Sequence, residues 1–85
     1  MSDESIEQLR AALAEVSERL RSAYRCASSA EQGLAQAIAL LTELNRSHHD
    51  QLVPPDLLRA DQELTRSLGL ISGGADSVAA VDARL

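Results

Sequence analysis

The chain is short and acidic, and 85 residues suffice for a single small domain, because a core of this size buries only about 60–65% of the surface that the unfolded chain exposes. Thirteen acidic residues against eight basic ones give a net charge of −5, which argues against a nucleic acid or an anionic lipid surface as a partner. Hydrophobic residues make up 45% of the chain but Tyr24 is the sole aromatic, so burial must come from aliphatic residues and alanine, a composition that favours closely packed helices.

The first half of the chain carries an apolar residue at alternating steps of three and four. These positions are Ile6, Leu9, Leu13, Val16, Leu20, Ala23, Ala27, Ala30, Leu34, Ala37, Leu41 and Leu44. This spacing keeps one row of side chains on one side of a helix, and no proline interrupts it. We therefore expect one helix over residues 5–46. Ser2 is a candidate N-cap residue, with Asp3 and Glu4 in the first turn.

A break in this helix is the competing interpretation. Residues 28–31 match a capping box, in which Ser28 would cap a new helix and Glu31 would reach back to it, and Gly33 follows closely. The apolar row nevertheless keeps its phase from Leu20 to Leu34, which a real break would disturb. The sequence therefore favours a continuous helix.

Residues 47–54 predict the turn, because they are mostly polar and end in Pro54, which precedes a second proline. Pro55 suits the first position of a second helix, which we expect over residues 55–83. Its apolar row comprises Leu57, Leu64, Leu68, Ile71, Ala75, Val78 and Leu85, widened by Leu58, Leu70 and Val81. The glycines near Ser72 make residues 72–74 the expected place for a kink or an early stop. A close pair of small residues, Gly69 and Gly73, would allow close packing.

An antiparallel hairpin that turns near residue 50 would bring together residues whose numbers sum to about 100. Leu85 would then lie near Glu15 and Val16, and about ten N-terminal residues would lack a partner within the chain, because the first helix would measure roughly 60 Å and the second roughly 45 Å. We expect a second chain to cover them, most simply in a homodimer that forms a four-helix bundle or coiled coil. The expected interface residues are Ile6, Leu9, Leu13, Val16, Leu20, Ala23, Ala27, Ala30, Leu34 and Leu41.

Two aspartates, Asp61 and Asp82, occupy positions in the apolar row of the second helix. A carboxylate there either finds a partner or turns to solvent, since its burial without one costs several kcal/mol. The expected register places Asp82 close to Glu18 and Arg19, with Arg21 also within reach, and Arg19 is its first expected partner. Such a buried polar residue can specify register or oligomeric state; the alternative is that both aspartates tilt into water.

The sequence offers little catalytic or metal-binding chemistry. The cluster His48-His49-Asp50 has ligand types for a divalent metal, but adjacent residues on a turn seldom close a site alone, so a solvated turn is preferred. Cys26 lacks a visible base and pocket, and residues 73–74 lack the other features of a phosphate-binding loop. We therefore predict no catalytic, cofactor-binding or metal-binding residue and no enzymatic activity.

The lone cysteine cannot form an internal disulfide and fits a reducing cytoplasm best. The acidic start of the chain does not match a secretory signal peptide, and no apolar run approaches the roughly 18 residues that span a bilayer. We therefore expect a cytoplasmic protein without membrane insertion. Export by a route other than general secretion stays open.

The layout of a long helix, a short polar turn at residues 48–52 and a return helix resembles the helical hairpins of the WXG-type substrates of actinobacterial type VII secretion. The Trp-x-Gly turn of that family is absent, and residues 78–85 lack its Tyr-x-x-x-Asp/Glu export signal. No family residue carries over. The expected function is a non-enzymatic interaction module, such as an adaptor, small chaperone or assembly component. The alternative that the resemblance implies is a secreted hairpin that pairs with a second small helical protein.

Overall fold

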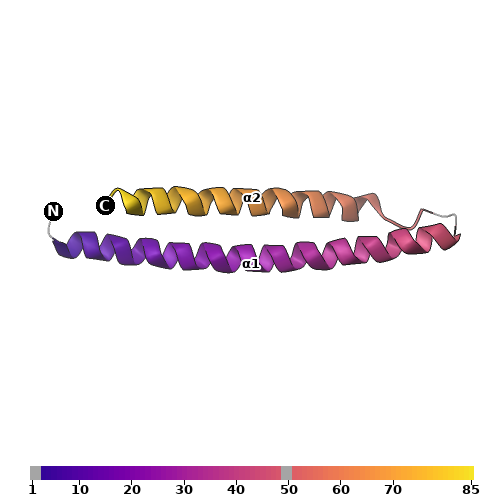
Figure 1. The fold of residues 1–85 in the computed structure, drawn as a ribbon, viewed down its shortest axis with the longest axis horizontal. Helices are drawn as coiled ribbons and strands as arrows, with labels where there is room; N and C mark the ends of the chain where they lie inside the picture. Colours follow the sequence, from indigo (N-terminus) through magenta and orange to yellow (C-terminus); the bar gives the residue numbers. More distant parts are fainter. Residues whose placement is uncertain (1–2, 49–50) are drawn as a thin grey trace.

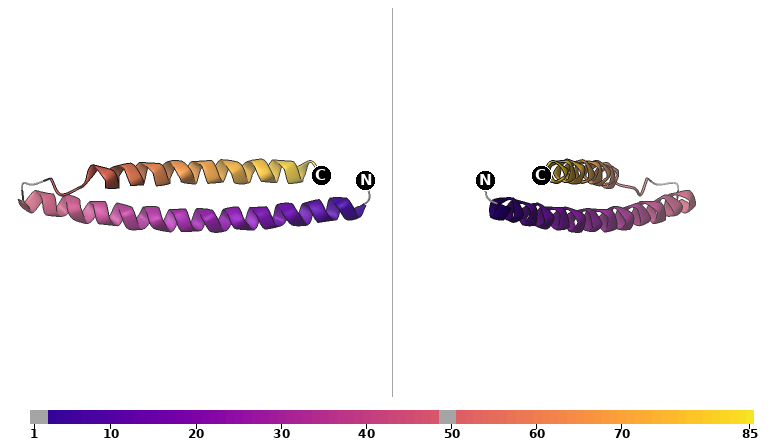
Figure 2. Two further views of the ribbon diagram at one scale, coloured as in Figure 1. Left: turned by 180° about the vertical axis from the view of Figure 1, so that it is seen from behind. Right: turned by 60° about the vertical axis from the view of Figure 1, so that its left-hand side comes forward.

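The computed structural model describes residues 3–48 and 51–85, which form two helices, α1 (Asp3–His48) and α2 (Pro55–Ala83). The helices lie side by side and antiparallel, so that both chain ends are at the same end of the molecule (Figure 1). Figure 2 shows the same pairing from two further directions. The molecule measures 69 × 15 × 14 Å. The predicted all-α fold with two long helices is confirmed.

Helix α1 is continuous over its 46 residues. It passes through Ser28 and Gly33 without interruption, which decides against the break that a capping box there would have introduced. It extends slightly beyond the predicted 5–46 at both ends, and its last turn includes His48. The candidate cap Ser2 lies outside the described residues. Exposed ion pairs along α1 include Arg19–Glu15 at 3.0 Å and Arg46–Glu43 at 3.2 Å, each of which stabilises a helix by only about 0.3–0.5 kcal/mol.

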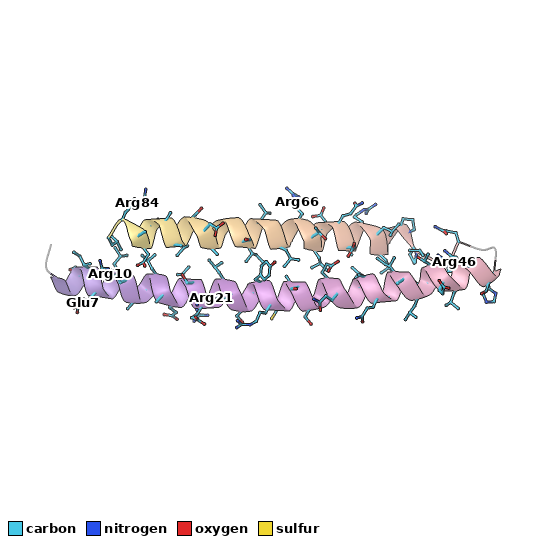
Figure 3. The ribbon with its side chains drawn as sticks, viewed as in Figure 1. Glu7, Arg10, Arg21, Arg46, Arg66 and Arg84 are labelled. Atoms are coloured by element: carbon cyan, nitrogen blue, oxygen red, sulfur yellow. The ribbon has the colours of Figure 1, made fainter. Side chains whose placement is uncertain are left out.

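Helix α2 begins at Pro55, as predicted, because Pro54 has the extended backbone (φ −63°, ψ 137°) that a proline favours before a helix. The first backbone bond of α2 runs from the Leu57 N–H to the Pro54 carbonyl at 3.0 Å. The helix then continues through Gly73 to Ala83, so the expected kink or early stop is absent from its 29 residues. Figure 3 shows Arg66 and Arg84 on the side of α2 away from α1.

The expected close packing at the glycines of α2 is also absent. A methyl group built at Gly69 or Gly73 meets no atom within 4 Å. Each glycine in a helix interior costs about 0.5–1 kcal/mol relative to alanine. Nothing within the hairpin offsets that cost by allowing two backbones to approach.

The linker between the helices is held against the end of α1 by one side chain, Asn45. Its Oδ1 accepts a hydrogen bond from the Leu52 N–H, and its Nδ2 donates to Gln51 Oε1 at 3.0 Å. Val53, which follows, is 6% exposed and is the one buried residue in the described part of the chain. The linker therefore folds back along α1, as Figure 1 also shows.

This fold-back corrects the predicted register. An extended residue advances about 3.3 Å and a helical one about 1.5 Å, so residues 51–54 carry the start of α2 about 7 Å further back along α1 than a helical path would. Leu85 consequently lines a hollow with Ile6 and Arg10, and not with Val16 as predicted. The expected uncovered N-terminal segment of about ten residues is wrong for the same reason: α2 reaches the first turns of α1.

Candidate interaction surface

The hairpin exposes far more surface than a compact chain of its mass. Its accessible surface is 6388 Å², whereas a compact monomer of 9.1 kDa exposes about 4,900 Å², which leaves an excess of about 1,500 Å². Two helices alone can cover each other along one side only. The molecule therefore has helix surface available for a further partner.

Helix α2 partly covers one side of α1. The residues of α1 that are partly buried are Ile6, Leu13, Ser17, Leu20, Ala27, Ser28, Glu31, Leu34, Ala37, Ile38, Leu41 and Asn45. The expected interface residues thus divide into two groups. Ile6, Leu13, Leu20, Ala27, Leu34 and Leu41 belong to this covered side, whereas Leu9, Val16, Ala23 and Ala30 are exposed.

The hydrogen bonds between Asn45 and the linker explain which side of α1 is covered by α2. The apolar surface of α1 is wider than one helix can cover, so α2 can pack over either half of it. Asn45 holds the linker, and it lies at intervals of seven from Ile38 and Glu31, which places all three on one line along α1. Because the linker leaves α1 over this line, α2 packs along the line. Leu9, Val16, Ala23 and Ala30 therefore stay uncovered.

A second continuous row, exposed at every position except the partly buried Ala37, forms what we name the open face of α1. It steps by three and four through Leu9, Ala12, Val16, Arg19, Ala23, Cys26, Ala30, Gly33, Ala37, Leu40 and Leu44. Leu9 is 40% exposed, Val16 42% and Leu40 68%. Arg19 is its one charged residue, and it pairs with Glu15 along the same helix. Low charge with exposed aliphatic groups is the composition of an interface core.

The opposite side of the helix pair contains two shallow hollows, the first of which has mainly apolar walls. One, of about 300 Å³, is lined by Leu20, Arg21, Tyr24, Arg25, Ile71, Ser72 and Ala75. The second, of about 250 Å³, holds Asp82 together with Arg10 and Arg21. The predicted pairing of Asp82 with Arg19 is therefore wrong, because the corrected register moves Asp82 towards the start of α1 and Arg19 points along its own helix to Glu15. Arg21, the other cation expected within reach of Asp82, does line the same hollow.

Asp61 does lie between the helices, where its carboxyl group meets that of Glu31. The hydrogen bond with Asp61 raises the pKa of the Glu31 carboxyl above 4.5, and desolvation and the negative charge of Asp61 add to the rise. Asp61 Oδ1 is buried without a hydrogen-bond partner in the described part of the molecule. Glu31 was not predicted to face α2; its spacing of seven from Ile38 is the signal that could have indicated it.

The remaining candidates are the histidine cluster at the end of α1 and Cys26. His48 ends α1, while His49 and Asp50 lie outside the described residues, and no group of His, Cys, Asp and Glu within residues 3–48 and 51–85 could hold a metal ion. Cys26 is an exposed free thiol. Neither helix, over its described length, is long and apolar enough to span a membrane. Comparison of the chain with protein-family models, curated proteins and solved structures found no match.

Proposed function

We propose that this protein is a non-enzymatic interaction module, an adaptor, small chaperone or assembly component, that binds another helical chain through the open face of α1. The observation that carries the proposal is the continuous row from Leu9 to Leu44, in which every residue except the partly buried Ala37 is exposed. Such a row brings no benefit to an isolated hairpin, because exposed aliphatic groups in water are unfavourable.

Energetics support a partner. Val53 is the one buried side chain in the described residues, and a chain of 85 residues must offset an ordering entropy of about 1–2 kcal/mol for each residue. A second helix over the open face would bury additional aliphatic groups at about 25 cal/mol for each Å². Association is therefore the route by which this hairpin gains a core.

A matched pair of substitutions tests the proposal. Leu9 on the open face is 40% exposed and Leu58 on α2, outside that face, is 44% exposed, and both lie near the start of a helix. We expect Leu9→Asp to abolish association and to lower helicity, because it places a charge in the buried interface. Leu58→Asp should change neither. Light scattering during gel filtration and circular dichroism measure the two properties.

A fully helical wild-type monomer of 9.1 kDa at micromolar concentration would contradict the proposal. The secreted hairpin that pairs with a second small helical protein remains the alternative, supported by the hairpin architecture. In that case the chain alone would be poorly folded, and co-expression with its helical partner would restore helicity. A Leu9→Asp variant would then fail to bind that partner.

A further inference from the structure

The open face of α1 is self-complementary. We infer that its occupant is the same face of a second copy, antiparallel to the first, about a twofold axis between Ala23 and Cys26. This inference rests on the proposed function and names the partner and the geometry that it requires. A twofold axis uses the same patch on both chains, so that each contact occurs twice.

Side-chain sizes along the open face fit this axis. Leu9 faces Leu40 in the outermost apolar layer, and Leu44 faces Ser5 beyond it. Every layer between has a small residue on at least one side, which lets the two backbones come close. In the order first copy and second copy, the paired layers are Leu9 with Leu40, Ala12 with Ala37, Val16 with Gly33, Arg19 with Ala30, and Ala23 with Cys26. In every layer, a residue that is followed by a step of three along the row faces one that is followed by a step of four. Facing residues in antiparallel coiled coils alternate in the same way.

Gly33 supports this register independently of the other residues. It lies in the interior of a 46-residue helix, is exposed, and has open space where a side chain would be. Within one hairpin this destabilising residue has no packing role. In the proposed pair, Gly33 lies opposite Val16 of the second copy, which supplies a branched side chain for the space that Gly33 leaves.

Charge selects the same orientation and register. The row beside the open face pairs Gln8 with Glu43 and Glu15 with Gln36 of the second copy, so no like charges meet. A parallel pair in register would bring Arg19 against Arg19 in the interface. An antiparallel pair shifted by seven residues in one direction brings Glu15 against Glu43. The opposite shift leaves both Leu40 and Leu44 without an apolar residue facing them, whereas the proposed register leaves only Leu44 so placed, opposite Ser5.

The area is sufficient for a specific interface. From Leu9 to Leu44 the open face is about 53 Å long, and a face about 10 Å wide gives about 1,000 Å² in total over both copies. This is about the minimum area of a biological interface. The share of each copy, about 500 Å², lies within the excess of about 1,500 Å² that each copy exposes. The excess also leaves surface on α2 for contacts between the two hairpins.

Disulfide cross-linking tests the geometry, because Cys26 is the only cysteine and is exposed. With helix axes about 8–9 Å apart and Cα atoms about 2.3 Å from each axis, the two Cys26 Cα atoms would lie about 6 Å apart, within disulfide range. Copper phenanthroline in air should therefore convert the wild-type chain, at low micromolar concentration, to a covalent dimer on non-reducing gels. Leu9→Asp should reduce the yield at least tenfold.

The control moves the thiol along the same face. In Cys26→Ser/Ala12→Cys the two thiols of an antiparallel pair lie about 37 Å apart, so we expect at least tenfold less covalent dimer. Adding Ala37→Cys should restore cross-linking, because Ala12 and Ala37 face each other across the axis.

Efficient cross-linking of Cys26→Ser/Ala12→Cys would indicate a parallel pair and overturn the inference. So would a dimer that does not cross-link at Cys26, or a chain that folds only with a different helical protein; the proposed function would survive all three results. A folded wild-type monomer would overturn both.

Discussion

The carboxyl groups of Glu31 on α1 and Asp61 on α2 meet between the two helices, where Asp61 Oδ1 is buried and has no hydrogen-bond partner in the described structure. Two carboxylates in contact repel each other, whereas a protonated Glu31 can donate a hydrogen bond to Asp61. This contact makes the stability of the hairpin depend on pH.

The pKa of Glu31 is raised above 4.5 in the folded chain, so near this pH the folded state binds more protons at Glu31 than the unfolded state does. The contribution of protonated Glu31 to the stability of the fold is therefore fully present below about pH 4.5, and it is lost as pH rises through the raised pKa. We expect Glu31→Gln to remove that loss, so that its melting temperature exceeds that of the wild type at neutral pH. Melting curves from pH 3 to 7 measure the effect. A Glu43→Gln control should keep the wild-type profile, and parallel profiles for all three chains would contradict the prediction.

Asn45 connects the end of α1 to the linker through Leu52 and Gln51. Asn45→Ala removes both hydrogen bonds and leaves the partly buried Leu52 N–H without its partner, so we expect a loss of about 1–2 kcal/mol in the free energy of unfolding. Gln51→Ala removes only the exposed bond and should cost less than about 0.5 kcal/mol. Urea unfolding followed by circular dichroism separates the two, and equal effects would show that the Leu52 bond does not hold the linker.

The heptad spacing was sufficient to predict two helices and their approximate bounds, because a 3.5-residue period specifies a helix wherever no proline interrupts it. The register was not predictable from spacing, since it depends on the extended path of residues 51–54 and on Asn45, neither of which contributes to periodicity. The side of α1 that α2 covers was also ambiguous. Leu9 and Ile38 lie on opposite flanks of the Leu13 line, and both flanks carry apolar residues.

Val53 is the one buried side chain in the described residues, although it lies in the linker and not in a helix. Val53→Ala removes two buried methyl groups, and we expect a loss of about 1.5 kcal/mol in the free energy of unfolding. Val81→Ala, at a position that is 38% exposed, should cost clearly less. Equal free energies of unfolding for the two variants in chemical denaturation would show that the burial of Val53 in the linker does not stabilise the fold.

Substitutions at Gly69 on α2 and Gly33 on α1 separate the stability of one hairpin from the association of two copies. Gly69 and Gly33 both have open space in place of a side chain, so alanine at either position should increase helix propensity by about 0.5–1 kcal/mol. Gly69→Ala should therefore raise the melting temperature without affecting self-association. Gly33→Ala places a methyl group where Val16 of the second copy is proposed to pack, and we expect its dimer dissociation constant to rise about tenfold, about 1.4 kcal/mol. Sedimentation equilibrium measures that constant. A Gly33→Ala variant that associates as tightly as Gly69→Ala would place the contact between copies elsewhere on the molecule.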